Sequence, residues 1–292
     1  MSTPSNEAKY PSLSVLARQQ TFNRRTRANS ALFEPHRRRV TGTIVAASRV
    51  PAGHLCVLGA GNANDLDLPV LARAFDQTHL VDLDPEALWQ AAERHPKLDP
   101  VVRLHSGVDL SGIATQLDNI DQPPRAEQIG ELITAARNVP TPRLAEPYEV
   151  VASTCLLTQL MNASVAAVGE TEPRLLELLA AIRIGHLRLL ANMVAPGGTG
   201  LLFTDIASSD DVPEIATTSD PSRLAAELTR RKKLFVGIDP QQIEDDLRDE
   251  PLIAPRIEAL TPIGVWPWRI NETRTFLASG ISFRIVPGKN LK

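Results

Sequence analysis

The stretch from Leu55 to Asp65 constrains the fold of this chain more than any other. It begins with four apolar residues, Leu-Cys-Val-Leu, and continues as Gly-Ala-Gly-Asn-Ala-Asn-Asp. A short apolar run that ends in glycines is typical of a strand buried on both faces. Because glycine has no Cβ, Gly59 and Gly61 tolerate a sharp turn and let backbone N–H groups approach a ligand closely. The stretch therefore predicts a buried strand, a glycine turn and then a helix.

A second apolar run, His79–Leu83, carries an acid at Asp82, which lies 21 residues beyond Gly61. In a nucleotide-binding β-α-β unit, an acid about 20 residues after the glycine turn lies where a ribose presents its hydroxyl groups. The two signals together predict an adenosine-containing ligand at the ends of these strands.

Strand and helix patterns alternate along most of the chain. Further strands are expected at 101–105, 148–153, 200–205 and 275–286, and helices at 65–75, 84–94, 126–137 and 172–194. Thr171 is the expected N-cap of the last helix. This alternation implies right-handed crossovers and a parallel sheet with helices on both faces. The expected fold is α/β, with a doubly wound sheet.

The length of 292 residues fits one large domain. Residues 1–15 are expected to be a flexible tail, and residues 16–292 a single domain that begins with helices over 16–50. Two proline-rich or irregular segments, at about 110–147 and 207–262, interrupt the strand–helix rhythm and are interpreted as insertions. We expect the insertions and the N-terminal helices to form a lid over the ligand.

Composition limits the possible partners. A net charge of −3 gives no general attraction to nucleic acid, and an aromatic content of 4% gives no platform for stacking bases. No apolar run reaches the roughly 18 residues of a membrane span. Both cysteines lie in apolar runs without metal-ligand spacing, as expected of reduced thiols in a cytoplasmic protein. A small-molecule substrate is the favoured partner, with no metal; the sequence indicates no oligomeric state.

Three features together resemble class I S-adenosylmethionine-dependent methyltransferases. They are the glycine turn, the strand that ends in Asp82, and the run 193–202, in which a helix leads through Pro-Gly-Gly into an apolar strand. The resemblance covers roughly residues 35–110, 148–206 and the C-terminal strands. It implies a mostly parallel seven-stranded sheet with an antiparallel last strand, S-adenosylmethionine as cofactor, and transfer of its methyl group.

The resemblance also implies roles for individual residues. The glycine turn would lie against the methionine part of the cofactor, Asp82 would accept hydrogen bonds from the ribose, and Val108 with Asp109 would meet the adenine. Ser153 and Thr154, at the end of a strand, would face the sulfonium or the substrate. The full set of expected cofactor-binding positions is Gly59, Ala60, Gly61, Asn62, Asp82, Leu83, Val108, Asp109, Ser153 and Thr154.

Candidates for contact with the methyl acceptor lie at strand ends or are aromatic. They are Thr158, Gln159, Asp205, Trp266 and Trp268. The two tryptophans could equally pack the last strands onto a helix. Among the histidines, His105 is expected to be a half-buried structural residue or to line the site, His186 is expected in the core, and His36 receives no role.

The sequence departs from the family pattern at three places. The acid that often precedes the glycine turn by two positions is Val57 here, which puts in doubt the contact with the cofactor's amino group unless Asp65 or a helix residue supplies the charge. The third glycine is Ala63, where a left-handed backbone would be strained. No Asn/Asp-Pro-Pro-aromatic motif follows the strand at 148–153, which disfavours amino-directed DNA or protein glutamine methyltransferases.

Three other readings remain open. A nicotinamide-dependent oxidoreductase also needs a glycine turn and a downstream acid, but its third glycine would stand at Asn64. A binding module of the same fold would hold the cofactor or a nucleotide without turnover. A transferase of the aminocarboxypropyl or aminopropyl arm would use the same cofactor and sheet. The favoured hypothesis is a methyltransferase that acts on a small molecule.

Overall fold

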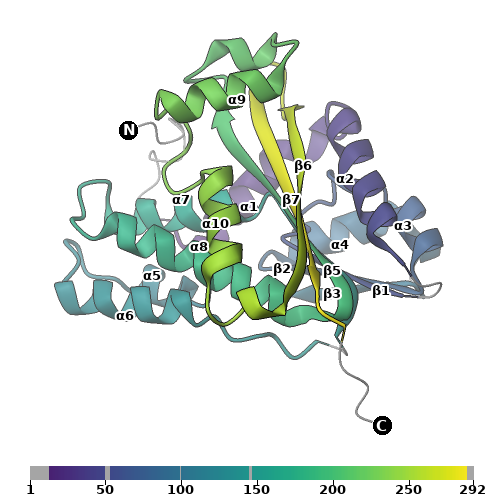
Figure 1. Cartoon of the computed structure of the whole chain (residues 1–292), viewed down its shortest axis with the longest axis horizontal. Helices are drawn as coiled ribbons and strands as arrows, with labels where there is room; N and C mark the ends of the chain where they lie inside the picture. Colours follow the sequence, from purple (N-terminus) through teal and green to yellow (C-terminus); the bar gives the residue numbers. More distant parts are fainter. Residues whose placement is uncertain (1–12, 50–52, 99, 145–146, 288–292) are drawn as a thin grey trace.

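The structure is a computed structural model that describes residues 13–49, 53–98, 100–144 and 147–287. Within them, seven strands form one sheet in the order β3-β2-β1-β4-β5-β7-β6 (Figure 1). β7 runs antiparallel to both of its neighbours, and the other pairs are parallel. This confirms the expected fold class: a doubly wound, mostly parallel, seven-stranded sheet with an antiparallel last strand.

The strands differ in length across the sheet. Their bounds are β1 His54–Leu58, β2 Gln77–Asp82, β3 Val102–Ser106, β4 Tyr148–Thr154, β5 Val194–Ser208, β6 Ile257–Arg269 and β7 Thr275–Ile285. β1 lies inside the sheet between β2 and β4, with Leu55, Cys56, Val57 and Leu58 completely buried. A buried aliphatic side chain of this size stabilises the fold by about 1.5–3 kcal/mol. The apolar run Leu55–Leu58 is therefore part of the hydrophobic core.

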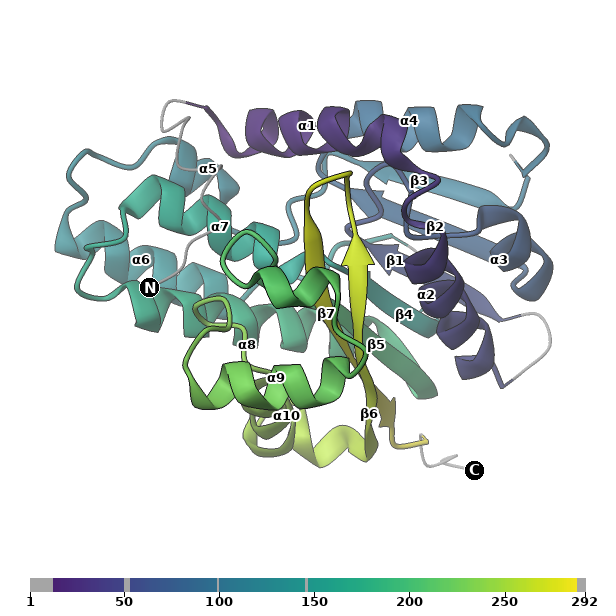
Figure 2. The same ribbon diagram turned by 90° about the horizontal axis from the view of Figure 1, so that it is seen from above.

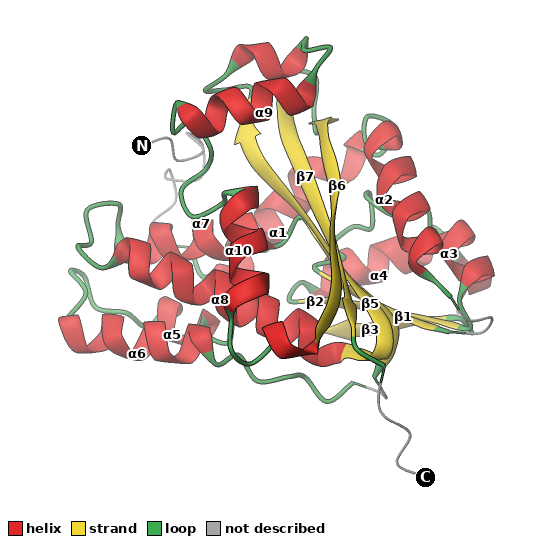
Figure 3. Ribbon diagram, in the orientation of Figure 1, coloured by secondary structure: helices red, strands yellow, loops and turns green. Residues whose placement is uncertain are grey.

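Helices cover both faces of the sheet (Figure 3). Their bounds are α1 Val15–Thr26, α2 Glu34–Ala47, α3 Leu68–Ala74, α4 Pro85–Glu93, α5 Ala114–Asp118, α6 Ala126–Arg137, α7 Leu157–Val168, α8 Leu175–Met193, α9 Pro221–Arg230 and α10 Pro240–Asp249. α2, α3 and α4 pack on one face, whereas α8 and α10 pack on the other, with α6 against α8. α1 contacts α4, α5 and α7, and runs beside α4 in Figure 2.

Two helix boundaries differ from the sequence-based expectation. The first helix after the glycine turn begins at Leu68, not at residue 65, because the Asp67 carboxylate accepts the N–H of Val70 and caps the helix there. Residues 59–66 therefore remain a loop. The long helix begins at Leu175, so Thr171 is not its N-cap; Glu172 instead accepts the N–H of Arg174 at 3.0 Å in a preceding turn.

The strands of the C-terminal half are longer than expected. β5 includes Ala195-Pro196-Gly197-Gly198, and it continues to Ser208 because β7 pairs with it from Thr199 to Ser208. β6 begins at Ile257, within the range expected for the second insertion. At the N-terminus, α1 already begins at Val15; residues 1–12 of the expected tail lie outside the described residues.

Candidate functional site

The glycine turn after β1 has a left-handed backbone at three positions. Gly59 has φ +74°, Gly61 has φ +47° and Ala63 has φ +51°. A Cβ added to Gly59 would lie 2.7 Å from the Cβ of Leu156, so no larger residue fits there. Ala63 adopts the conformation that the sequence marked as strained, at a cost of about 1–3 kcal/mol. The turn therefore has the sharp backbone that the sequence predicted, and contact of its residues with the cofactor stays a prediction.

Asp82 ends β2 directly beside this turn. Its Oδ2 accepts the Gly61 N–H at 2.8 Å, and its Oδ1 accepts the Asp84 N–H at 2.8 Å. Asp82 is 2% exposed, and this burial raises the pKa of its carboxyl to about 6. Each carboxylate oxygen can accept a further hydrogen bond. Two hydroxyl groups of a ribose are donors of the required kind.

A cavity opens next to Asp82 between α1, α7 and the loop that follows β3. Asp82, Leu83, Val108 and Asp109, all expected to bind the cofactor, line it together. Its other walls combine apolar side chains, such as Phe22, Leu156 and Leu160, with polar ones that include Arg18 and Arg25 of α1. A cavity with apolar walls and a buried carboxylate in its lining suits a flat base joined to a sugar.

The sequence does not predict that α1 forms a wall of the cavity next to Asp82. Asn23 donates from Nδ2 to Asp84 Oδ2 at 2.9 Å, and its carbonyl oxygen accepts from Asn62 Nδ2 at 2.6 Å. Asn64 Nδ2 donates to the carbonyl oxygen of Thr26 at 3.0 Å. These bonds hold α1 against the glycine turn. Polar residues inside a helix, such as Asn23, carry no sequence signal that names a distant partner.

Ser153 and Thr154 point to different sides of the sheet, as neighbours in a strand must. The Ser153 hydroxyl lies 2.8 Å from Nε2 of His186 on α8. The Thr154 hydroxyl donates to the carbonyl oxygen of Gly59 at 3.3 Å. Thr154 is therefore beside the glycine turn, whereas Ser153 faces the core, where His186 is fully buried as expected.

Two of the predicted residues make bonds that shape the protein itself. The Asp109 carboxylate accepts the backbone N–H groups of Ser111, Gly112 and Ala114, which folds the loop at the edge of the cavity. His105 lies 2.8 Å from His79, ring nitrogen to ring nitrogen, in a histidine pair on β3 and β2. The pair is consistent with a structural role for His105.

The candidates for acceptor contact are brought to one region at the ends of β4, β5 and β6. The Thr158 hydroxyl donates to the carbonyl oxygen of Asp205 at 3.1 Å, and Asp205 is itself buried. Gln159 lines the cavity. Trp266 and Trp268 are buried against His36, whose ring stacks on that of Trp268 with centroids 4.5 Å apart. Contact of these residues with an acceptor stays a prediction.

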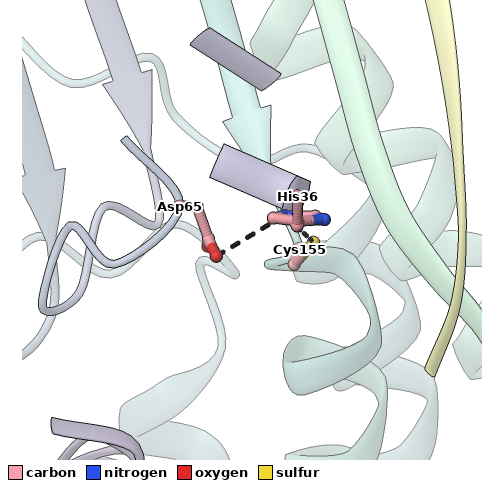
Figure 4. A group of neighbouring side chains, drawn as sticks. All are labelled: His36, Asp65 and Cys155. Carbon is pink, nitrogen blue, oxygen red and sulfur yellow. Dashed lines mark hydrogen bonds and ion pairs between the residues drawn. The ribbon is translucent and has the colours of Figure 1, made fainter. Parts of the chain in front are cut away.

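Sequence reasoning missed a cluster of three side chains from separate elements. His36 on α2, Asp65 in the loop after the glycine turn and Cys155 after β4 point toward one another, with their polar atoms within 4.8 Å (Figure 4). Nε2 of His36 lies 3.5 Å from Asp65 Oδ1 and 4.0 Å from Cys155 Sγ. The only available signal was the missing acid at Val57, which made Asp65 a possible substitute.

No family model matches the chain, and no curated protein matches it either. Its structure is similar to several solved ones. Bacillus subtilis YcgJ is 12% identical, with 85% of this chain and 98% of that chain covered and a TM-score of 0.44. A putative S-adenosylmethionine-dependent methyltransferase from Methanococcus maripaludis is 10% identical, with 94% of each chain covered and a TM-score of 0.45.

An O-methyltransferase family protein from Burkholderia thailandensis is 16% identical, with 94% of this chain and 61% of that chain covered and a TM-score of 0.45. Likenesses of this size carry no argument about activity. The strand order and the antiparallel β7 show independently that the chain has the sheet that its resemblance to class I methyltransferases implied. Among the described residues, no helix has the length and apolar character needed to cross a membrane.

Proposed function

We propose that this protein is an S-adenosylmethionine-dependent methyltransferase that acts on a small molecule. The observation that carries the proposal is the Asp82 carboxylate, which is buried, bonded to the glycine turn through Gly61, and open to an apolar cavity. Val108 and Asp109 line the same cavity, so the adenine attached to a ribose bound at Asp82 would lie near them. Bound S-adenosylmethionine would supply the methyl group.

The protein would contribute mainly by positioning. Methyl transfer from a sulfonium needs an acceptor lone pair in line with the breaking bond, and orientation alone supplies a large part of such a rate enhancement. The end of β4 lies beside the glycine turn, where Thr154 bonds to Gly59, and Thr158 on α7 bonds to Asp205 on the neighbouring β5. These residues are the candidates for aligning the acceptor.

Calorimetric titration with S-adenosylmethionine, S-adenosylhomocysteine and NAD tests the proposal. The first two ligands should bind. Asp82→Ala should lower the affinity for both roughly 100-fold, since two hydrogen bonds to a charged group contribute about 3 kcal/mol or more. Asp211→Ala, at an exposed acid, is the matched control. Binding of NAD alone would contradict the proposal and favour an oxidoreductase; binding of S-adenosylmethionine without methylation across an acceptor panel would favour a binding module.

A further inference from the structure

The cluster of His36, Asp65 and Cys155 has the composition of a metal site or of a thiol with its base, but the tautomer of His36 excludes both. The Trp266 indole Nε1–H donates to His36 Nδ1 at 3.0 Å. An indole nitrogen can only donate, so Nδ1 must hold a lone pair. His36 is 1% exposed and burial lowers its pKa to about 3, so the ring is neutral and carries its proton on Nε2.

That proton faces the other two members of the cluster. A protonated Nε2 has no lone pair with which to bind a metal ion or to accept a proton from Cys155. Burial also raises the pKa of the Cys155 thiol, with the charges of Asp65 and Asp205 adding to the effect. His36 is therefore a fixed N–H donor, and Cys155 a neutral thiol. The member of the cluster whose chemistry remains open is Asp65.

Asp65 lacks a cation in direct contact among the described residues. Its Oδ1 is buried and has no hydrogen-bond partner, and its one ion-pair distance is to the neutral His36. Burial raises the pKa of Asp65 to about 7, although the charge of Arg37 opposes that rise. Arg37 itself bonds to the carbonyl oxygens of Ser30 and Asn64. A buried carboxylate in this state is costly unless a positive group reaches it.

The position of Asp65 indicates which positive group that is. Cys155, its neighbour in the cluster, is followed by Leu156, which packs on Gly59; the preceding Thr154 bonds to the Gly59 carbonyl oxygen. The Asp65 side chain is 16% exposed, so part of it is accessible to solvent although its Oδ1 is buried. Asp65 thus lies at the end of the glycine turn where the amino-acid part of the proposed cofactor would lie, with Asp82 at the adenosine end.

Gln159 adds a second free acceptor between the cavity and the cluster. It lines the cavity, its Nε2 donates to the Cys155 carbonyl oxygen at 3.0 Å, and its Oε1 is buried without a partner. Two unsatisfied acceptors, one of them a carboxylate, call for a donor with a positive charge. An ammonium group has three N–H donors, which is enough for two such acceptors.

We propose that Asp65, with Gln159 Oε1 as second acceptor, binds the ammonium group of the cofactor's amino-acid end. The inference rests on the proposed function. It explains how the chain dispenses with an acid at Val57: the carboxylate is supplied from the loop after the turn. The arrangement makes Asp65 a specificity-determining residue, because a ligand that lacks the amine leaves the carboxylate and the amide oxygen unpaired.

The test compares S-adenosylhomocysteine with its desamino analogue, which keeps the carboxylate and lacks the amine. The wild-type protein should prefer S-adenosylhomocysteine, and Asp65→Asn should reduce that preference roughly tenfold or more by weakening S-adenosylhomocysteine alone. Asp67→Asn is the matched control, because Asp67 caps α3 two residues further on and Asn caps equally well. Asp65→Ser, with a thermal melt of each variant, gives a second measurement if the first variant is unstable.

The outcomes separate the inference from the proposed function. If the wild type binds both ligands and the preference survives in Asp65→Asn and Asp65→Ser, the assignment of Asp65 is wrong and the cofactor proposal stands. Equal weakening of both ligands by the two substitutions would also overturn the assignment, since it would indicate a general loss of structure. If the wild type binds neither ligand, the proposed function fails and the inference fails with it.

Discussion

Two aspartates flank the glycine turn in opposite conditions: Asp82 beside the turn is buried, and Asp65 in the loop after it is partly exposed. Asp82 has both oxygens engaged by backbone N–H groups and faces an apolar cavity. Asp65 has an oxygen with no hydrogen-bond partner and lies against a neutral histidine. The backbone thus arranges one acid to receive neutral hydroxyls, whereas the other acid lacks a positive partner. A ligand with hydroxyls at one end and an ammonium at the other fits both.

The largest effect is expected at Gly59, the first residue of the glycine turn. Gly59→Ala forces an alanine into φ +74° and brings its Cβ to 2.7 Å from Leu156. Backbone strain and overpacking together should lower the free energy of unfolding by ~3 kcal/mol. Both S-adenosylhomocysteine and its desamino analogue should bind more weakly, as measured by calorimetry on the folded fraction.

Gly107→Ala is the control for that substitution. Gly107 has φ +72°, but an added Cβ there meets nothing within 4 Å. Only the strain of a left-handed alanine remains, at ~1 kcal/mol. Equal losses in the two variants, measured by urea unfolding, would show that contact with Leu156 does not determine the shape of the turn.

A smaller effect, confined to the Asp65 end, is expected from Trp266→Phe. The substitution removes the N–H that His36 Nδ1 accepts, and leaves a buried acceptor without a partner. The expected cost is about 1–2 kcal/mol of stability. Affinity for the desamino analogue should not change. Nitrogen-15 spectra should report the Nε2-protonated tautomer of His36 in the wild type and a mixture in the variant; an unchanged spectrum would contradict the role assigned to Trp266. Trp89→Phe, at an exposed tryptophan, serves as control.

The smallest effect is a difference in pH dependence between the two ends. Desolvation raises the pKa of Asp65 to about 7 and that of Asp82 to about 6. Both carboxyls must be ionised to bind their partners, so affinity is lost as pH falls. The affinity for S-adenosylhomocysteine should fall below about pH 7, and that for the desamino analogue only below about pH 6. Roughly tenfold in affinity should be lost per pH unit below each pKa. Asp65→Asn should make the two profiles coincide.

The unliganded protein should show the opposite trend. Because both folded-state pKa values lie above those of an unfolded aspartate, ionisation of these groups favours unfolding. Their contribution to stability is greatest at low pH and is lost as pH rises from about 4 to 7. Thermal melts of the wild type and of Asp65→Asn across this range measure it. A variant that keeps the full slope would show that Asp65 does not contribute.

Local spacing is what made the Asp82 end predictable. Gly59, Gly61 and Asp82 belong to one β-α-β unit whose two strands pair directly. A fixed spacing along the chain therefore corresponds to a fixed arrangement in space. His36, Asp65 and Cys155 come from a helix, a loop and a strand end far apart in the sequence, and only the packing of α2 beside β4 and β5 brings them together. The start of α3 was misplaced for a related reason: the apolar period continues through Leu66, but the cap at Asp67 decides where the helix begins.

The indoles of Trp266 and Trp268 have a practical consequence. The chain contains three tryptophans, and Trp89 on α4 is 57% exposed. In a Trp89→Phe protein, all tryptophan fluorescence would come from the two indoles beside His36. Its emission would then follow events at the Asp65 end without any label. A ligand that binds only at the adenosine end should leave the emission spectrum unchanged. The emission would therefore report which part of a ligand is bound.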